Sequence, residues 1–583
     1  MIENPILRGF QPDASVCVVG EDYYIATSTF EWWPGVMIYH SRDLVNWDLV
    51  ARPLCRVSQL DLTGDRNSGG IWAPHLSWAN GRFWLMITDV KTDQCFKDTL
   101  NYLMSCETID GEWSDPVFVN ASGFDPALFH DDDGKSYVMS MLWDYRPYMP
   151  NFNGVAIQQY DLAENRLIGT PKLIFSGSGW GLTEGPQIMK KDGWYYLLCA
   201  EGGTGFSHAS VVCRSRNVDG PYEVSPYTPL ISTRFAPDSP LQKCGHASFL
   251  RAVSGEWYIT FICARPLTFQ RGNCELGRET GLAQIEWIED WPRLKDAQKA
   301  ELLSPEGGEI VLPDRTVTLP KAPTKAGWNP YCVPPLFVNA PSGMETVLQR
   351  LDFSEQTDFD EKELPVSFHS LRAPLGDRMS LTERPGYLRL YGRESIASLH
   401  TQTIVARRWQ SVTFKAGTVL EFYPTCSRQL AGLTCFYNTE NYVYAYVSYD
   451  EVRGCRILDV LVCDRKATVV ELGEKRISIP DEVERIRLEV RVDRENLQFF
   501  YAWGDEEWRA LGGVLPADHL SDDYIRPSAL VFTGSMVGIC AQDLFDHSSY
   551  ADFDSFYYQE ETRDPAGVKR ENKRNVPDEK TRR

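Results

Sequence analysis

Hydrophobic and polar positions alternate over short distances along most of the chain, and one longer pattern recurs five times in its first half. Each copy has a small polar or Pro-containing corner, a short apolar strand, a turn with Gly or Asp, and an aromatic-rich strand. After their corners, the copies have the sequences VCVVGEDYYIATSTF, HLSWANGRFWLMITDV, ALFHDDDGKSYVMSML, QIMKKDGWYYLLCAEGG and SFLRAVSGEWYITFICARP. The corners lie at positions 13, 73, 125, 184 and 246, so each interval has room for about four short strands.

This repeat predicts an all-β fold that begins with a five-bladed β-propeller. Four-stranded units that close radially protect the edges of their sheets, and sequence repeats of this length are typical of propellers. No segment sustains the 3.6-residue apolar period of a long helix. We therefore expect residues 1–310 to form the propeller.

Short alternating strands resume further along the chain and predict a second domain. A Pro-rich stretch over 311–344 has little periodicity and indicates an ordered linker on the surface. Segments such as VLEFYPTC, IRLEVRVD and ADFDSFYYQ follow it, and their regular spacing favours a β-sandwich over 345–560. Residues 561–583 are charged and almost devoid of apolar side chains, which predicts a disordered tail.

Composition excludes some classes of partner. The formal net charge is −21 without a basic stripe, which disfavours binding to nucleic acid or to an anionic membrane surface. The first residues, MIENPILRGF, do not have the pattern of a secretory signal, and no apolar run reaches the ~18 residues of a membrane span. The 15 cysteines lack metal-binding spacing. We therefore expect free, mostly buried thiols and a cytoplasmic protein.

Three carboxylates occupy comparable corners of the repeat. Asp13, Asp125 and Glu184 head the first strands of blades one, three and four, and His246 heads that of blade five. First strands of propeller blades line the central axis, so these side chains should converge at one end of the channel. Converging carboxylates raise one another's pKa, which is costly unless they have a function. Taken singly, either Asp could merely cap a turn, and His246 could be an ordinary core histidine.

Three carboxylates in an aromatic surrounding suit glycoside hydrolysis. One acid protonates the leaving oxygen, a second carboxylate activates water or attacks the anomeric carbon, and a third can keep the acid's pKa high. A metal hydrolase would show clusters of histidines instead. The aromatic residues expected around the carboxylates are Phe30, Trp32, Trp33, Trp72 and Trp143.

Several long motifs resemble glycoside hydrolase family 43, and within it the two-domain β-xylosidases. These motifs are GFQPDASV, STFEWWPGV, SGGIWAPHLSW, FKDTLNYL, ASGFDPALFHDDDGKSY, GLTEGPQIMK, AEGGTGFSHA, KCGHASF, LGRET, TGSMVGICAQDL and ADFDSFYY. They span nearly the whole chain in order. The resemblance implies an exo-acting xylan 1,4-β-xylosidase that releases D-xylose from non-reducing ends of xylo-oligosaccharides with inversion.

The resemblance also implies a role for each site residue. Asp13 matches the general base, Glu184 the general acid, and Asp125 the residue that tunes and orients the acid. Arg278 matches an arginine near the sugar hydroxyls and the carboxylates, for which its fork of donors is suited. The other residues matched to the subsite of the terminal xylose are Phe30, Trp72, Ala73, Trp143, Thr204 and His246.

Two residues depart from the family pattern. Gln11 stands where relatives have His before Pro-Asp, and Met536 stands where they have a Phe that reaches toward the pocket. We expect Met536 and its loop to line the subsite of the leaving sugar and to close the mouth of the channel.

The sequence also leads to predictions about cofactors, partners and alternative functions. No cofactor or metal is required, although a divalent cation near His246 is compatible with the sequence. The substrate is the expected partner, and an aromatic-rich surface would suit a homodimer or homotetramer. The nearest rival is an α-L-arabinofuranosidase, alone or as a second activity, because the two sugars present similar hydroxyls. A non-catalytic carbohydrate-binding propeller is the remote alternative, which predicts a degraded carboxylate corner, whereas all three are intact.

Overall fold

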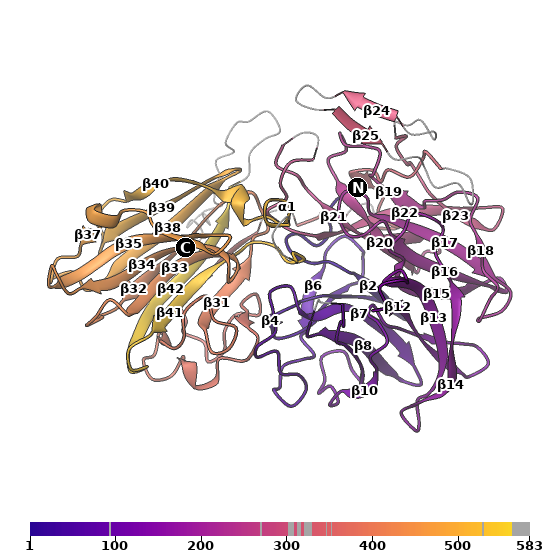
Figure 1. The fold of residues 1–583 in the computed structure, drawn as a ribbon, viewed down its shortest axis with the longest axis horizontal. Helices are drawn as coiled ribbons and strands as arrows, with labels where there is room; N and C mark the ends of the chain where they lie inside the picture. The colour runs from indigo at the N-terminus through magenta and orange to yellow at the C-terminus, as the bar shows by residue number, and fades with distance from the viewer. Residues whose placement is uncertain are drawn as a thin grey trace, which may run out of the picture.

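The computed structural model describes residues 1–92, 95–268, 271–300, 308–311, 316–319, 329–344, 347–350, 353–526 and 530–561. It has two bodies side by side, a propeller in indigo to magenta and a sandwich in orange to yellow (Figure 1). In the described ranges the one α-helix is the single turn α1 (Asp522–Ile525). The all-β expectation is therefore confirmed.

Five antiparallel sheets form the propeller, one for each repeat. The innermost strands are β2, β7, β11, β15 and β20. They contact one another in this order, and β20 contacts β2, which closes the ring. The blades contain β2 (Ser15–Val19), β3 (Asp22–Thr27), β5 (Met37–Ser41) and β6 (Asp48–Ala51); β7 (Gly70–Ala79), β8 (Arg82–Val90), β9 (Thr99–Cys106) and β10 (Val117–Asn120); β11 (Ala127–His130), β12 (Ser136–Trp143), β13 (Phe152–Asp161) and β14 (Arg166–Phe175); β15 (Glu184–Lys191), β16 (Trp194–Glu201), β17 (Ala209–Ser215), β18 (Glu223–Val224) and β19 (Ile231–Ser232); and β20 (Gln242–Arg251), β21 (Trp257–Ala264), β22 (Glu279–Ile288) and β23 (Trp291–Leu294).

The second body is a sandwich of two antiparallel sheets around one large apolar core. One sheet contains β27 (Ser354–Thr357), β29 (Met379–Ser380), β30 (Leu388–Tyr391), β32 (Thr413–Glu421), β38 (Ile486–Asp493), β39 (Asn496–Trp503), β40 (Arg509–Pro516) and β42 (Tyr550–Glu560). The other contains β31 (Thr403–Arg408), β33 (Gln429–Asn438), β34 (Asn441–Asp450), β35 (Cys455–Asp464), β36 (Ala467–Val470), β37 (Ile477–Ser478) and β41 (Met536–Asp543). Short 3₁₀ turns cover 376–378, 473–475 and 517–520.

The stretch expected to be a linker has strands of its own. β24 (Gly308–Val311) pairs with β25 (Thr316–Leu319), and β26 (Phe337–Val338) pairs with β1 (Ile2–Glu3) near the start of the chain. Residues 312–315 and 320–328, within the expected linker, lie outside the described residues, as do residues 562–583 of the expected tail.

The two bodies are joined by a strand pair and by buried charges. β4 (Trp32–Trp33) pairs with β28 (Ser370–Leu371), and the ring of Trp32 packs edge-on against Phe436 of the sandwich. Lys243 Nζ lies 2.9 Å from a carboxylate oxygen of Asp522 on α1, and neither side chain is exposed. Trp32 and Trp33 therefore belong to the domain junction rather than to the carboxylate site, which corrects the sequence-based expectation.

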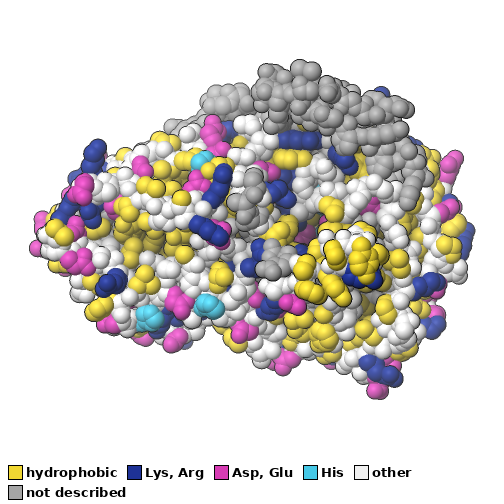
Figure 2. Space-filling model, in the orientation of Figure 1, with side chains coloured by type: hydrophobic (Ala, Val, Ile, Leu, Met, Phe, Trp, Pro, Cys, Tyr) yellow, Lys and Arg dark blue, Asp and Glu magenta, His cyan; other side chains and the backbone are white. Residues whose placement is uncertain are grey.

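The distribution of surface charge and the state of the cysteines agree with what the composition predicts. On the face shown in Figure 2, Lys and Arg side chains are scattered among Asp and Glu side chains. All 15 cysteines are unpaired, and most of them are buried, as expected. Within the described ranges, no helix is long and apolar enough to cross a membrane.

Candidate active site

The repeat corners place three of the predicted residues in one strained backbone conformation. Asp13, Asp125 and His246 have φ angles of 60°, 53° and 47°, in the left-handed region that side chains with a Cβ rarely adopt. In blade four the residue with this conformation is Gly185, at φ 57°. Glu184 therefore lies one residue before the position that Asp13 and Asp125 occupy. The pattern of the repeat had predicted equivalent positions for the three carboxylates.

Gly185 is required at its corner for a second reason. A Cβ atom built on it would lie 2.6 Å from Nε2 of His246, which is closer than side chains approach. The close passage of the backbone beside the imidazole brings Glu184 and His246 to the same end of the channel. The Thr-Glu-Gly-Pro corner is thus explained by packing as well as by the acid that it carries.

Asp13 is held by three side chains. Its Oδ1 atom lies 3.2 Å from Arg278 Nη1 and 3.3 Å from His246 Nδ1, and its Oδ2 atom accepts a hydrogen bond of 2.6 Å from the Ser28 hydroxyl. Burial raises the pKa of Asp13, but the opposing effects of Arg278 and His246 outweigh it and leave the pKa well below its usual range. Asp13 is therefore an ionised carboxylate in a nearly closed site.

The pKa values of Asp125 and Glu184 are raised, whereas that of Asp13 is lowered. Burial raises the pKa of Glu184 to about 8, and the negative charge of Asp125 adds to the shift. Burial likewise raises the pKa of Asp125 to about 6, although His246 opposes this rise. At neutral pH the site thus combines one firmly ionised carboxylate with one that retains its proton.

His246 is the cationic partner of the group. Burial lowers its pKa, but the hydrogen bond to Asp13 and the surrounding carboxylates raise it to about 9. The imidazole is therefore protonated at neutral pH and balances part of the negative charge. Among the described residues, no group of three or more His, Cys, Asp or Glu side chains is arranged to hold a metal ion.

Arg278 links the Asp13 corner to the sandwich. Nη1 donates a hydrogen bond of 2.9 Å to the Thr204 hydroxyl, and Nη2 donates one of 3.0 Å to the carbonyl oxygen of Phe532. The backbone N–H of Gln11 in turn donates to the Arg278 carbonyl over 2.9 Å. Gln11 is buried, and its side-chain oxygen accepts from Thr27. The unusual Gln11 thus supports the corner that holds Asp13.

Aromatic rings form one wall of the site. Phe30 lies 6.2 Å from Trp72 between ring centres, Trp72 lies 5.3 Å from Phe124, and Phe124 lies 6.3 Å from Trp143. Ala73 follows Trp72 on β7 and is buried. The structure therefore brings together the aromatic residues that the sequence placed here, other than the two tryptophans of the domain junction.

The sequence reading missed Lys97. Its ammonium group lies 4.6 Å from the ring centre of Trp143 and 5.1 Å from that of Trp72. Burial lowers its pKa to about 8, while the negative charge of Glu184 opposes this change. The motif FKDTLNYL contains this lysine, but nothing in the motif itself indicated that the side chain turns toward the rings.

The sandwich residue that reaches the site is Phe532, not Met536. The ring of Phe532 lies 6.0 Å from Phe30 and 5.1 Å from Trp72. Met536 begins β41, pairs with Arg408 and Phe436, and has no exposed surface with which to contact a sugar. The loop before β41 therefore brings the ring of Phe532 to the aromatic wall, whereas Met536 lies within the sheet and does not supply the side chain expected there.

The fold and the site define a glycoside hydrolase. Residues 2–292 match the model of glycosyl hydrolases family 43, and residues 356–559 match the β-xylosidase C-terminal concanavalin A-like domain. The chain belongs to glycosyl hydrolase family 43.

Three similar proteins illustrate the match. A β-xylosidase of Bacillus subtilis is 44% identical over 96% of this chain and 99% of its own length. A xylosidase/arabinosidase 43B of Humicola insolens is 42% identical over 96% and 97%. The crystal structure of a xylan β-1,4-xylosidase from Bacillus halodurans has a TM-score of 0.87 and 42% identity over 96% of this chain and all of that one.

Proposed function

We propose that this enzyme is an exo-acting, inverting xylan 1,4-β-xylosidase that releases D-xylose from the non-reducing ends of xylo-oligosaccharides. Proteins named as xylosidases that are 42–44% identical along nearly the whole chain support the substrate. The observation that carries the mechanism is that Asp13 is paired with Arg278 and His246, whereas burial and the nearby Asp125 raise the pKa of Glu184. Pairs of carboxyl groups whose pKa values are driven apart are typical of acid–base catalysis.

In the proposed reaction, Glu184 and Asp13 act on opposite sides of the anomeric carbon. Glu184 gives its proton to the glycosidic oxygen as the bond from that oxygen to the anomeric carbon breaks. Asp13 takes a proton from a water molecule whose oxygen forms the new bond to the same carbon. The products are a shortened alcohol and one free xylose, and inversion follows from attack on the opposite face.

The remaining polar residues adjust these two groups. Asp125 keeps Glu184 protonated, because its negative charge disfavours a second ionised carboxylate nearby. Arg278 and His246 keep Asp13 ionised, and Arg278 together with Thr204 offers hydrogen-bonding groups to the sugar hydroxyls. Lys97 lies over Trp72 and Trp143, which suits a contact to hydroxyls of a sugar that packs on these rings.

Exo action is supported by the position of Phe532. An open channel would admit long chains from either side, whereas an exo-acting enzyme needs a pocket that is closed behind the terminal sugar. The Phe532 ring, which the sandwich inserts against Phe30 and Trp72, supplies part of such a wall. The Arg278 hydrogen bonds to its carbonyl fix the wall to the catalytic corner.

A second activity on α-L-arabinofuranosides is favoured by one relative, the protein from Humicola insolens that is named for both sugars. Rates on 4-nitrophenyl β-D-xyloside and on 4-nitrophenyl α-L-arabinofuranoside, measured with the same enzyme, test the assignment. We expect the larger kcat/KM on the xyloside and release of xylose from xylobiose. Preference for the arabinofuranoside, with no cleavage of xylobiose, would overturn the proposed function.

We infer the cellular setting from composition. Free and mostly buried thiols suit a reducing compartment such as the cytoplasm, where imported xylo-oligosaccharides would be the substrate. The proposed reaction uses only side chains and water, so it needs no cofactor. A homodimer or homotetramer remains a prediction that sedimentation analysis can test.

A further inference from the structure

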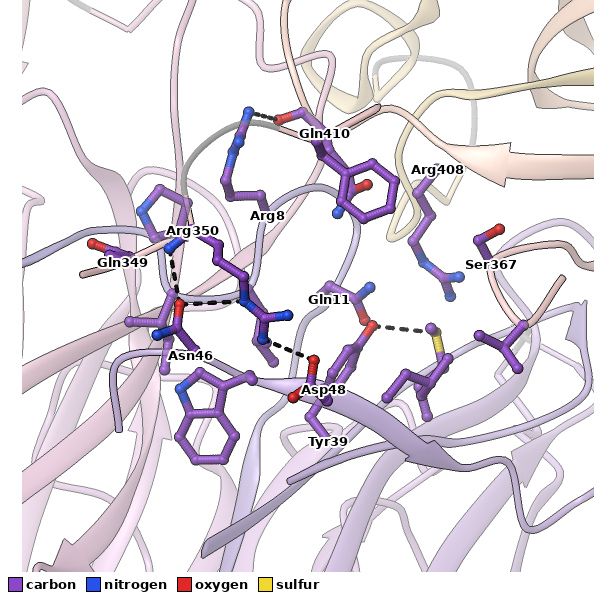
Figure 3. Close-up of a pocket in the computed structure, with 18 of the residues that line it drawn as sticks. Arg8, Gln11, Tyr39, Asn46, Asp48, Gln349, Arg350, Ser367, Arg408 and Gln410 are labelled. Carbon is purple, nitrogen blue, oxygen red and sulfur yellow. Dashed lines mark hydrogen bonds and ion pairs between the residues drawn. The ribbon is translucent and has the colours of Figure 1, made fainter. Parts of the chain in front are cut away.

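A pocket of about 570 Å³ lies between the propeller and the sandwich, lined by residues other than the carboxylates of the active site. Residues of blade one, among them Tyr39 and Asn46, form one side, and residues of the sandwich, among them Ser367 and Arg408, form the other (Figure 3). This volume is typical of sites that bind small organic molecules.

Four arginines line this pocket, and three of them have carboxylate partners. Arg8 lies 2.8 Å from Glu560, Arg350 lies 2.7 Å from Asp48, and Arg407 lies 2.6 Å from Glu355. The charge of each is therefore compensated within the protein. The fourth, Arg408, lies at the end of β31 and points into the pocket (Figure 3).

Arg408 is buried without a counter-ion. Only 4% of the residue is exposed, and in the described part of the chain no carboxylate lies within ion-pair distance of it. Nε donates to the carbonyl of Phe10 over 2.7 Å, and Nη1 lies 2.6 Å from Nε2 of His369. Burial and the nearby Arg408 lower the pKa of His369 well below its usual range, so this histidine is a neutral acceptor.

The other amino group of Arg408 has no hydrogen-bond partner. Nη2 is fully buried and unpartnered. A buried guanidinium that lacks both a counter-ion and a full set of acceptors is costly, and an anion with two oxygens satisfies both needs at once. Burial lowers the pKa of Arg408 only to about 10, so the cation persists at neutral pH.

We propose that this pocket is a binding site for a small organic anion whose carboxylate or phosphate group pairs with Arg408. The amide side chains of Gln11 and Asn46 and the ring of Trp47 line the same pocket and suit a polyhydroxylated ligand, such as a sugar acid or a sugar phosphate. The ligand would contact both bodies and stabilise their junction. It would also lie directly behind the segment that carries Asp13, because Phe10 and Gln11 belong to that segment.

The test uses the full-length protein with two anionic probes, D-gluconate and inorganic phosphate, and the neutral polyol xylitol as a control. Isothermal titration and thermal unfolding are measured for the wild type, for Arg408→Met, and for Arg350→Gln as a matched loss of a paired arginine at the same pocket. We expect at least one anion to bind and to raise Tm, with xylitol inert, and saturating xylose not to displace the anion. Binding should weaken at least about tenfold in Arg408→Met and little in Arg350→Gln. The preferred probe distinguishes a carboxylate ligand from a phosphate ligand.

A second pair of variants covers the case in which Arg408→Met does not fold. Val366 lines the pocket and is 56% exposed, so Val366→Glu adds a negative charge without removing the arginine, and Val366→Gln is its neutral control. Weaker anion binding in Val366→Glu than in Val366→Gln supports the site. Equal binding in these two variants, undiminished binding in Arg408→Met, or binding of neither anion by the wild type would overturn the proposal.

Discussion

Arg278 Nη1 lies 3.2 Å from Asp13 Oδ1, and the same guanidinium donates to the backbone carbonyl of a sandwich residue, Phe532. One side chain therefore ties the ionised carboxylate of the propeller to the loop that precedes β41. This connection gives the second body a part in the proposed reaction. Removal of the sandwich would take from Arg278 the backbone acceptor of Phe532 and from the aromatic wall the ring of Phe532, while the contacts of Arg278 to Asp13 and Thr204 would remain.

Glu184→Gln tests the role of the general acid. The variant cannot donate a proton, so cleavage of xylobiose should fall by about 10²–10⁴-fold. An aryl xyloside with an acidic phenol as leaving group should lose much less, because its departure needs no proton. Asp13→Asn is the matched variant, and it should suppress both substrates alike. Equal losses on both substrates in the two variants would remove the basis for the acid and base assignments.

The pH profile tests the coupling between Asp125 and Glu184. The acid must be protonated, and its pKa is about 8, so kcat/KM for xylobiose should fall as the pH rises through this value. The negative charge of Asp125 raises the pKa of Glu184, so its removal in Asp125→Asn should move the alkaline limb to lower pH, by about one unit. Glu31→Gln, a change at another buried carboxylate, should leave the limb in place. An unmoved limb in Asp125→Asn would contradict the coupling.

Phe532→Ala tests the wall supplied by the sandwich. The ring contacts Phe30 and Trp72, whereas the carbonyl that accepts from Arg278 belongs to the backbone and remains. We therefore expect KM for xylobiose to rise about tenfold or more, with a smaller change in kcat. Met536→Leu is the control, because Met536 is fully buried and a swap of similar volume costs little. If Met536→Leu changed KM more than Phe532→Ala, the result would favour Met536 as the side chain that lines the subsite of the leaving sugar.

Lys243→Met tests the buried charges between the two bodies. The substitution leaves Asp522 and Asp523 without the ammonium group that lies 2.9 Å and 2.8 Å from them. Removal of one partner from a buried ion pair typically costs about 3–5 kcal/mol of unfolding free energy. Chemical denaturation should show this loss, whereas Lys172→Met, at an exposed ion pair, should change stability little. Equal stability of the two variants would show that the junction does not depend on the charges.

The sequence predicted the propeller because its corners repeat at regular intervals, and each corner lies just before an inner strand or in its first half. It also indicated Asp13, Asp125 and Glu184, since charged residues at repeated corners are conspicuous. It could not show that Gly185, rather than Glu184, takes the left-handed position of blade four, because that difference lies in backbone angles.

Residues outside the repeat were harder to predict. Lys97 and Phe532 reach the site from segments whose paths depend on tertiary packing, and no local pattern distinguishes them from ordinary surface or core residues. Trp32 resembled a sugar-binding ring in sequence, but it is used by the domain junction. Such assignments depend on which surface each strand buries, which the pattern of one segment does not determine.

The anomer released first from xylobiose tests the central claim most directly. If Asp13 activates water while Glu184 protonates the leaving oxygen, proton NMR at early times should show α-xylose in excess, before mutarotation restores the equilibrium mixture. The inverting arrangement also requires the two carboxyl groups to lie about 6.5–9.5 Å apart. Initial accumulation of β-xylose would contradict the account, because it would require a covalent intermediate and a nucleophilic carboxylate.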